Sequence, residues 1–114
     1  IDVRIDSYSF GKVVIEGNTF SKDVIVFPDR VVDNWWRASG HSLCEADLTE
    51  VLAYKPEVLI IGRGAMGIMN VPTEVKKFLQ EQGIELITKR SKEACQIFNE
   101  MQGRRVILGL HLTC

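Results

Sequence analysis

The chain has 114 residues, which is the length of one domain. Hydrophobic residues make up 46% of it and charged residues 25%, a balance that is typical of globular proteins and excludes a disordered or fibrous chain. Fourteen Lys and Arg against fifteen Asp and Glu give a net charge of −1, so the charge balance indicates neither a nucleic-acid-binding surface nor a basic membrane-binding surface. No apolar run approaches the ~20 residues that a membrane-spanning helix needs. We therefore expect one globular domain over residues 1–114.

The cysteines point to a reducing compartment. Cys44, Cys95 and Cys114 are odd in number and show no CxxC spacing, so they indicate neither a disulfide framework nor a zinc knuckle. No signal peptide is recognisable, and we expect a cytoplasmic protein with three reduced thiols.

The first third of the chain predicts antiparallel strands. Residues 8–36 contain short runs of Val, Ile and Phe that are broken by turn-forming residues. The runs at 12–15 and 24–27 are each followed by a turn signal, and residues 30–36 are expected to form a return strand. These pieces predict a β meander that covers one side of a larger structure.

After residue 41 the apolar period changes from 2 to 3.6. We expect three helices and three strands, with the helices at 45–54, 72–82 and 91–103 and the strands at 58–61, 84–88 and 105–112. Ser91 is expected to cap the last helix. From residue 57 the order is β-α-β-α-β, so we expect parallel strands joined by right-handed crossovers. The chain as a whole predicts an α/β fold with a mixed sheet and helices packed on it.

A glycine-rich segment, residues 62–67, follows the buried strand directly. Gly62, Gly64 and Gly67 match the pattern G-x-G-x-x-G of dinucleotide-binding folds, but in that fingerprint the glycines must open a helix. Pro72 marks the expected helix start five residues later, which argues against a dinucleotide. Two readings stay open: the glycines serve only a tight turn, or their amide groups together with Arg63 hold a carboxylate, a phosphate or a partner's backbone.

Two further features could take part in binding. Trp35 and Trp36 are adjacent, so in a strand they point to opposite faces, and one indole could lie in the core while the other forms an interaction surface beside Arg37. Both indoles could also pack inside. His41 lies in a polar loop and could act as a general base, although no nucleophile is identifiable for it. His111 and Cys114 point to opposite faces of an expected strand, so we expect no metal site, and no catalytic motif is present.

An ordered set of segments across nearly the whole chain resembles a known family. The matching segments are Ser7-Tyr8-Ser9-Phe10-Gly11, residues 58–64, Val71-Pro72, Phe98-Asn99 and His111-Leu112-Thr113-Cys114. They resemble a small family of largely unknown function, the DUF498 type, found in archaea, bacteria and eukaryotes. Its eukaryotic relatives include an adipogenesis-associated cytoplasmic protein and a mitochondrial assembly factor of respiratory complex I.

The resemblance implies a three-layer α/β sandwich with a central mixed sheet, no established enzymatic activity and no known cofactor. In the assembly-factor relatives, the role is to bind other proteins. Our leading expectation is therefore a non-catalytic protein-binding module with another protein as its partner. The alternative is a small-molecule or anion-binding protein, or a weak enzyme, that uses residues 62–67. The candidate site residues are Gly62, Arg63, Gly64, Gly67, His41, Trp35 and Trp36.

Overall fold

The computed structural model describes residues 3–35, 37 and 42–113. Twelve elements follow one another in these residues: β1 (Ile5–Ser9), β2 (Lys12–Ile15), β3 (Asn18–Phe20), β4 (Val24–Val26), β5 (Val31–Val32), the 3₁₀ helix η1 (Glu45–Leu48), α1 (Thr49–Tyr54), β6 (Val58–Arg63), α2 (Thr73–Glu81), β7 (Glu85–Lys89), α3 (Ser91–Glu100) and β8 (Val106–His111). The expected β-α-β-α-β unit is confirmed as β6, α2, β7, α3 and β8.

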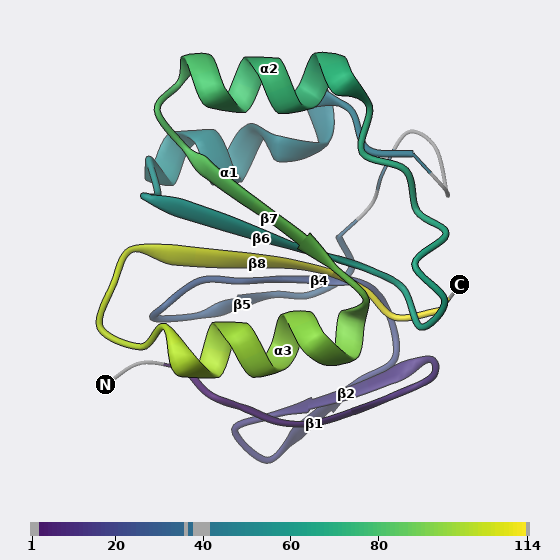
Figure 1. The fold of residues 1–114 in the computed structure, drawn as a ribbon. Helices are drawn as coiled ribbons and strands as arrows, with labels where there is room; N and C mark the ends of the chain where they lie inside the picture. Colours follow the sequence, from purple (N-terminus) through teal and green to yellow (C-terminus); the bar gives the residue numbers. More distant parts are fainter. Residues whose placement is uncertain (1–2, 36, 38–41, 114) are drawn as a thin grey trace.

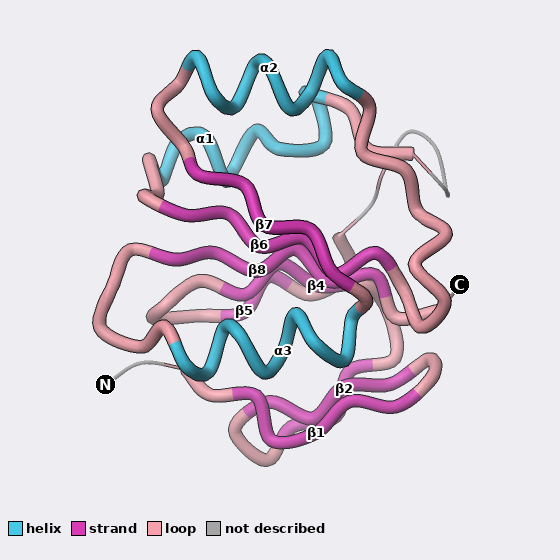
Figure 2. Tube along the Cα trace, in the orientation of Figure 1, coloured by secondary structure: helices cyan, strands magenta, loops and turns pink. Residues whose placement is uncertain are grey.

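The strands form two sheets, which Figure 2 shows in magenta. A three-stranded antiparallel meander has the order β1-β2-β3, and a five-stranded mixed sheet has the order β5-β4-β8-β6-β7. Strand β6 is parallel to both β7 and β8, as the crossover helices require, whereas β4 pairs antiparallel with β8. The antiparallel pairing brings the start of β4 to the end of β8, and this position becomes important for the site.

The mixed sheet lies between two layers, with α1 and α2 on one face and α3 and the meander on the other (Figure 1). Each face has its own apolar core. One core includes Leu48, Val51 and Leu79 beneath the first pair of helices, and the other includes Val13 and Phe98 beneath α3 and the meander. The expected three-layer α/β sandwich with a central mixed sheet is therefore confirmed.

One expected strand is much shorter than predicted, and one expected helix is divided. The return strand predicted at residues 30–36 is only Val31–Val32 long. After it, Asn34 has a positive φ of 59°, which interrupts the regular pairing, and the Trp35 N–H then donates to the Asp23 carbonyl. The helix predicted at 45–54 is divided into η1 and α1. Helix α1 ends at Tyr54, and Lys55 after it has a positive φ of 56° before Pro56.

Gly62 allows α3 to approach the end of β6. A Cβ atom at Gly62 would lie 2.6 Å from Leu110 Cδ1 and 2.9 Å from Ser91 Oγ, so any side chain there would collide with its neighbours. The φ of Gly62 is not positive, and close approach is what requires glycine at this position.

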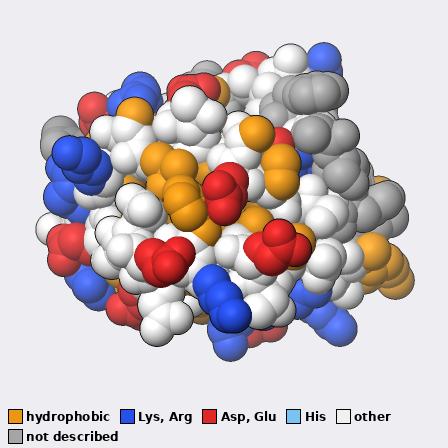
Figure 3. Space-filling view, turned by 90° about the horizontal axis from the view of Figure 1, so that it is seen from above, with side chains coloured by type: hydrophobic (Ala, Val, Ile, Leu, Met, Phe, Trp, Pro, Cys, Tyr) orange, Lys and Arg blue, Asp and Glu red, His pale blue; other side chains and the backbone are white. Residues whose placement is uncertain are grey.

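No helix in the described part of the chain is long and apolar enough to cross a membrane. Figure 3 shows the face over α1 and α2, where acidic and basic side chains are interspersed around a small apolar group. A surface of mixed sign agrees with the net charge of −1.

Candidate functional site

The candidate site lies at the edge of the mixed sheet where β6 and β8 end. Arg63 and His111 are the last residues of these parallel strands and lie opposite each other in register. Val24 pairs with Leu110, so Asp23, which precedes it, reaches the same edge. Ligands of open α/β sheets commonly bind outside the carboxyl ends of strands, which makes this edge the candidate site.

The glycine-rich corner, residues 62–67, turns the chain away from the sheet and opens no helix. Gly64 and Gly67 have positive φ values of 98° and 69°, which favour glycine. The next helix, α2, begins only at Thr73. Since a dinucleotide fingerprint places its glycines at the start of a helix, the corner does not have that geometry.

The amide groups of the corner are used inside the protein. The N–H of Gly64 donates to Ser91 Oγ (2.9 Å), the N–H of Ala65 donates to the Thr113 carbonyl (2.7 Å), and the N–H of Gly67 donates to the Gly64 carbonyl (3.3 Å). An amide that already donates a good hydrogen bond has little to offer an anion. The corner is therefore a turn held by internal hydrogen bonds. This geometry does not favour the hypothesis that its amides bind an anion.

Arg63 is also tied to its own loop. Its Nε donates to the Met69 carbonyl at 2.6 Å, and the Met69 N–H donates to the Arg63 carbonyl at 3.1 Å. These two bonds close the loop that follows β6. The side chain is half-buried, so the guanidinium acts first as a structural clamp.

Ser91 does not cap α3, so that prediction is wrong. Arg90 is the N-cap residue, and it makes no side-chain capping bond, while Ser91 is the first residue of the helix. The fully buried Ser91 hydroxyl accepts a hydrogen bond from the Gly64 N–H and donates one to the His111 carbonyl. It therefore joins the corner, the start of α3 and the end of β8.

A buried polar cluster, which no sequence pattern indicated, lies behind the corner. Asp23 Oδ2 lies 2.6 Å from Arg37 Nη2 and 2.8 Å from His111 Nδ1, and its Oδ1 accepts the Leu112 N–H at 2.9 Å. Burial alone would raise the pKa of Asp23, but the hydrogen bonds from His111, Leu112 and Arg37 outweigh it and lower the pKa. Asp23 is therefore a stable carboxylate that links the start of β4 with the end of β8.

Trp35 lies in the core beside this cluster. Its ring packs on Gly109, where a Cβ would lie 3.0 Å from Trp35 Cη2, and its indole N–H donates to the Asp47 carbonyl. The Arg37 guanidinium lies 5.0 Å from the centre of the ring, within the range of a cation–π contact. Two other candidate site residues, Trp36 and His41, lie outside the described residues, as does Cys114.

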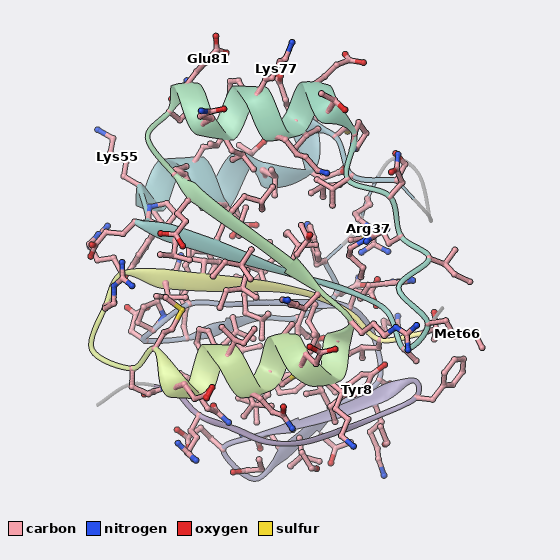
Figure 4. The ribbon with its side chains drawn as sticks, in the orientation of Figure 1. Tyr8, Arg37, Lys55, Met66, Lys77 and Glu81 are labelled. Carbon is pink, nitrogen blue, oxygen red and sulfur yellow. The ribbon has the colours of Figure 1, made fainter. Side chains whose placement is uncertain are left out.

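Exposed apolar side chains lie on loops at the outer side of the same edge. Phe10, Met66 and Ile68 are the large hydrophobic side chains that the described residues leave exposed, at 63%, 66% and 52%. Met66 points outward from the loop that follows β6 (Figure 4). We call these three residues the apolar rim.

Hydrogen bonds to two neighbouring carbonyls hold the segments that carry Phe10 and Met66. The Gly11 N–H donates to Leu112 (2.8 Å) and the Ala65 N–H donates to Thr113 (2.7 Å). Phe10 and Met66, each adjacent to one of these donors, are therefore held on the segment that follows β8. The sequence signal was available, since Met66 and Ile68 sit in a loop between a strand and a helix, where apolar side chains are uncommon.

The thiols and carboxylates of the described residues form no metal site. Among the residues that the structure describes, no three His, Cys, Asp or Glu side chains lie close enough together to hold a metal ion. Burial raises the pKa of the Cys95 thiol to about 12, which keeps it protonated and unreactive at neutral pH.

Comparison with known proteins gives one family and a consistent fold. The sequence profile described as "Protein of unknown function (DUF498/DUF598)" matches residues 5–111. The crystal structure of conserved hypothetical protein PH1505 from Pyrococcus horikoshii OT3 is 28% identical, has a TM-score of 0.87, and covers 97% of this chain and 99% of its own. A structure named MT938 is 26% identical with a TM-score of 0.80, and it covers 98% of this chain and 99% of its own.

A protein described as an outer membrane protein from Bartonella henselae has a TM-score of 0.84 at 24% identity, over 99% of this chain and 97% of its own. At that identity the likeness concerns the fold alone. The profile match, in contrast, spans all but a few residues at each end. The chain therefore belongs to the DUF498 family of proteins of unknown function.

Proposed function

We propose that this chain is a non-catalytic protein-binding module and that the apolar rim is its contact surface. The role would be of the assembly-factor kind that the family resemblance implies, in which the module binds another protein without transforming it.

The proposal rests on the position of the exposed apolar side chains. Phe10, Met66 and Ile68 come from two segments far apart in the sequence, and the hydrogen bonds to Leu112 and Thr113 hold those segments side by side. Aromatic residues and Met are enriched at the centres of protein interfaces. Large apolar side chains left in water are costly for a monomer and useful for a protein that docks.

The polar groups behind the rim support a structural role for the inner side of the edge. Asp23, Arg37 and His111 are bonded to one another and have little exposed surface. The Ser91 hydroxyl is fully buried and makes two hydrogen bonds, so it is not presented as a nucleophile. A catalytic polar group must lie within hydrogen-bond distance of a reacting atom of the substrate. Here the polar groups bond to other groups of the protein.

The rival function, binding of a small anion at residues 62–67, has weaker support because the corner amides are engaged. It can be tested with inorganic phosphate in a thermal-shift assay. Binding at ~100 Kd would stabilise the fold by about 2.7 kcal/mol. No shift with phosphate, and no loss of function in Arg63→Ala, would count against it.

The proposal is tested by site-specific photo-crosslinking in the cell that makes the protein. A photoactivatable side chain replaces Met66 in one variant and Lys77, on the outer face of α2, in the matched control (Figure 4). We expect one discrete crosslinked product from position 66 and none from position 77. Adding Phe10→Ser to the position 66 variant should reduce the yield severalfold. Equal labelling from both positions, or none from position 66, would refute the proposal.

A further inference from the structure

The two edges of the mixed sheet differ in length. The edge strand β5 has only two residues, a common way of protecting an edge from unwanted pairing. The opposite edge strand, β7, has five residues, Glu85–Lys89, and contains neither Pro nor a bulge. No strand of the described residues pairs with its outer side, and Figure 1 shows β7 uncovered at the front of the sheet.

The outward backbone groups of β7 can be identified from its pairing. The Glu85 N–H donates to the Glu57 carbonyl at 3.0 Å, and Glu85 pairs in register with Val58 of β6. In a parallel pair, the N–H and C=O of one residue both point to the neighbouring strand, and those of the next residue both point to the opposite side. Glu85, Ile87 and Lys89 therefore face β6, and the N–H and C=O groups of Leu86 and Thr88 face outward.

We propose that β7 pairs antiparallel with β7 of a second copy of this chain, about a two-fold axis at Ile87. In this register Leu86 of each copy lies opposite Thr88 of the other. These are the residues whose backbone groups point outward, so the four hydrogen bonds of the pair form without any change in the strand. The two five-stranded sheets then become one continuous sheet.

Charge selects this register. The strand reads Glu85, Leu86, Ile87, Thr88, Lys89, so a two-fold axis at Ile87 places Glu85 of each copy opposite Lys89 of the other. Both side chains are exposed, and opposite charges across an antiparallel pair are stabilising. With the axis at Leu86 or at Thr88, one charged residue would lie opposite Ile87, and the other would lie opposite a residue outside the strand. Both Glu–Lys pairs would then be lost.

The surface beside β7 has room for the second strand. A hollow of about 390 Å³ runs between α2 and the strand, lined by Lys76, Gln80, Ile84, Glu85, Leu86 and Thr88. Leu86 packs partly on the core under α2, while Ile87 packs partly on the core under α3. Both are half-buried, and a second strand at this edge would cover the apolar surface that they still expose.

The experiment is sedimentation velocity over a concentration series, which distinguishes the 12.9 kDa monomer from a particle of twice that mass. We expect the wild-type chain to form a dimer as its concentration rises. Glu85→Lys places Lys opposite Lys at both symmetric positions, and Lys89→Glu places Glu opposite Glu. Each single variant should weaken the dimer by at least about tenfold in Kd.

Two rescues distinguish this interface from a general charge effect. The double variant Glu85→Lys/Lys89→Glu restores both opposite-charge pairs and should dimerise again. An equimolar mixture of the two single variants should form heterodimers, because one chain then carries acidic side chains at both positions and faces basic side chains at both positions of the other. A wild-type chain that remains monomeric, or a dimer that the single variants do not weaken, overturns the proposal. If the double variant and the mixture both stay monomeric, the proposed register is overturned.

A crosslink gives a second readout. Ile87→Cys brings two thiols together at the two-fold axis, within the Cα separation that a disulfide spans, while Leu86→Cys does not. We expect an oxidised dimer only from Ile87→Cys, made in a chain with Cys44 and Cys114 replaced by Ser. Equal crosslinking of both variants would contradict the register. Phe10→Ser should leave dimerisation unchanged, which separates this proposal from the function assigned to the apolar rim.

Discussion

At the carboxyl edge of the mixed sheet, two groups of side chains reverse the usual pattern of burial. Asp23, Arg37 and His111 are polar and lie inside, while the apolar rim lies outside. The inner group joins the start of β4 to the end of β8 through charge-assisted hydrogen bonds. The rim side chains are more than half exposed. The inner side stabilises the edge, and under the proposed function the outer side is free to change for recognition.

Removing the carboxylate of the inner group should have the largest effect. Asp23→Ala takes the counter-ion from the buried Arg37 and an acceptor from His111 and the Leu112 N–H. Breaking a buried ion pair on one side costs about 3–5 kcal/mol, so the free energy of unfolding should fall by that amount. Urea denaturation at neutral pH measures it.

The matched control is Asp29→Ala. Asp29 also pairs with an arginine, Arg30, at 3.4 Å, but both side chains are half or more exposed. A surface pair contributes about 0–1 kcal/mol, so this variant should be close to wild type. Equal losses in Asp23→Ala and Asp29→Ala would show that the inner cluster has no special role.

Ser91→Ala should have the next largest effect. The change leaves the Gly64 N–H and the His111 carbonyl without their buried partner. Each buried group that loses its hydrogen bond costs about 1–3 kcal/mol, and we expect a total loss of about 2–4 kcal/mol. Ser21→Ala, at an exposed serine, is the control and should be neutral. If Ser91→Ala matched this control in urea denaturation, the bridge between corner, helix and strand would be unimportant.

Gly62→Ala tests the close approach of α3 to β6. The new methyl group would collide with Leu110 Cδ1 and Ser91 Oγ, and overpacking of this kind costs about 1–3 kcal/mol. Combining it with Leu110→Val removes part of the collision. The double variant should therefore lose less stability than the sum of the two single variants. Strict additivity would mean that the side chain of Leu110 is not what excludes a Cβ there.

The sequence predicts the frame of the molecule better than it predicts the site. Apolar runs and helical periods identify β6, α2, β7, α3 and β8, because each is specified by its own local pattern. The inner polar cluster has no such pattern, since Asp23 lies 88 residues from His111 and Arg37 lies 74 residues from it. The antiparallel pairing of β4 with β8 brings Asp23 to His111, and the hydrogen bond from the Trp35 N–H to the Asp23 carbonyl holds the segment of Arg37 beside them.

Ser91 shows a second limit of local prediction. A serine at the start of a helix is a favourable cap by itself, and only the tertiary structure makes Arg90 the cap. The hydroxyl is then directed to two other segments. The role of the glycines at residues 62–67 could not be decided locally for the same reason, because the partners of their amides, Ser91 and Thr113, come from elsewhere in the chain.

The pH dependence of stability should be smaller than the effect of Asp23→Ala, because a protonated carboxyl still accepts a hydrogen bond. The folded pKa of Asp23 lies below its ordinary value of 3.8. Its contribution is therefore fully present above that value and is lost as the pH falls through the lower folded pKa. Urea denaturation at decreasing pH should show this loss in the wild type and less of it in Asp23→Asn. Identical acid profiles would contradict the shift.

Changes on the apolar rim should have the smallest effect on stability and the largest on recognition. Phe10→Ser/Met66→Ser replaces two exposed side chains, so the free energy of unfolding should stay within about 0.5 kcal/mol of wild type. With the photoactivatable side chain placed at Ile68, the same double change should abolish the crosslinked product. A large loss of stability would show that the rim packs on the fold, and an unchanged crosslink would show that the partner binds elsewhere. Either result would remove the distinction between a stabilising inner side and a recognising outer side of this edge.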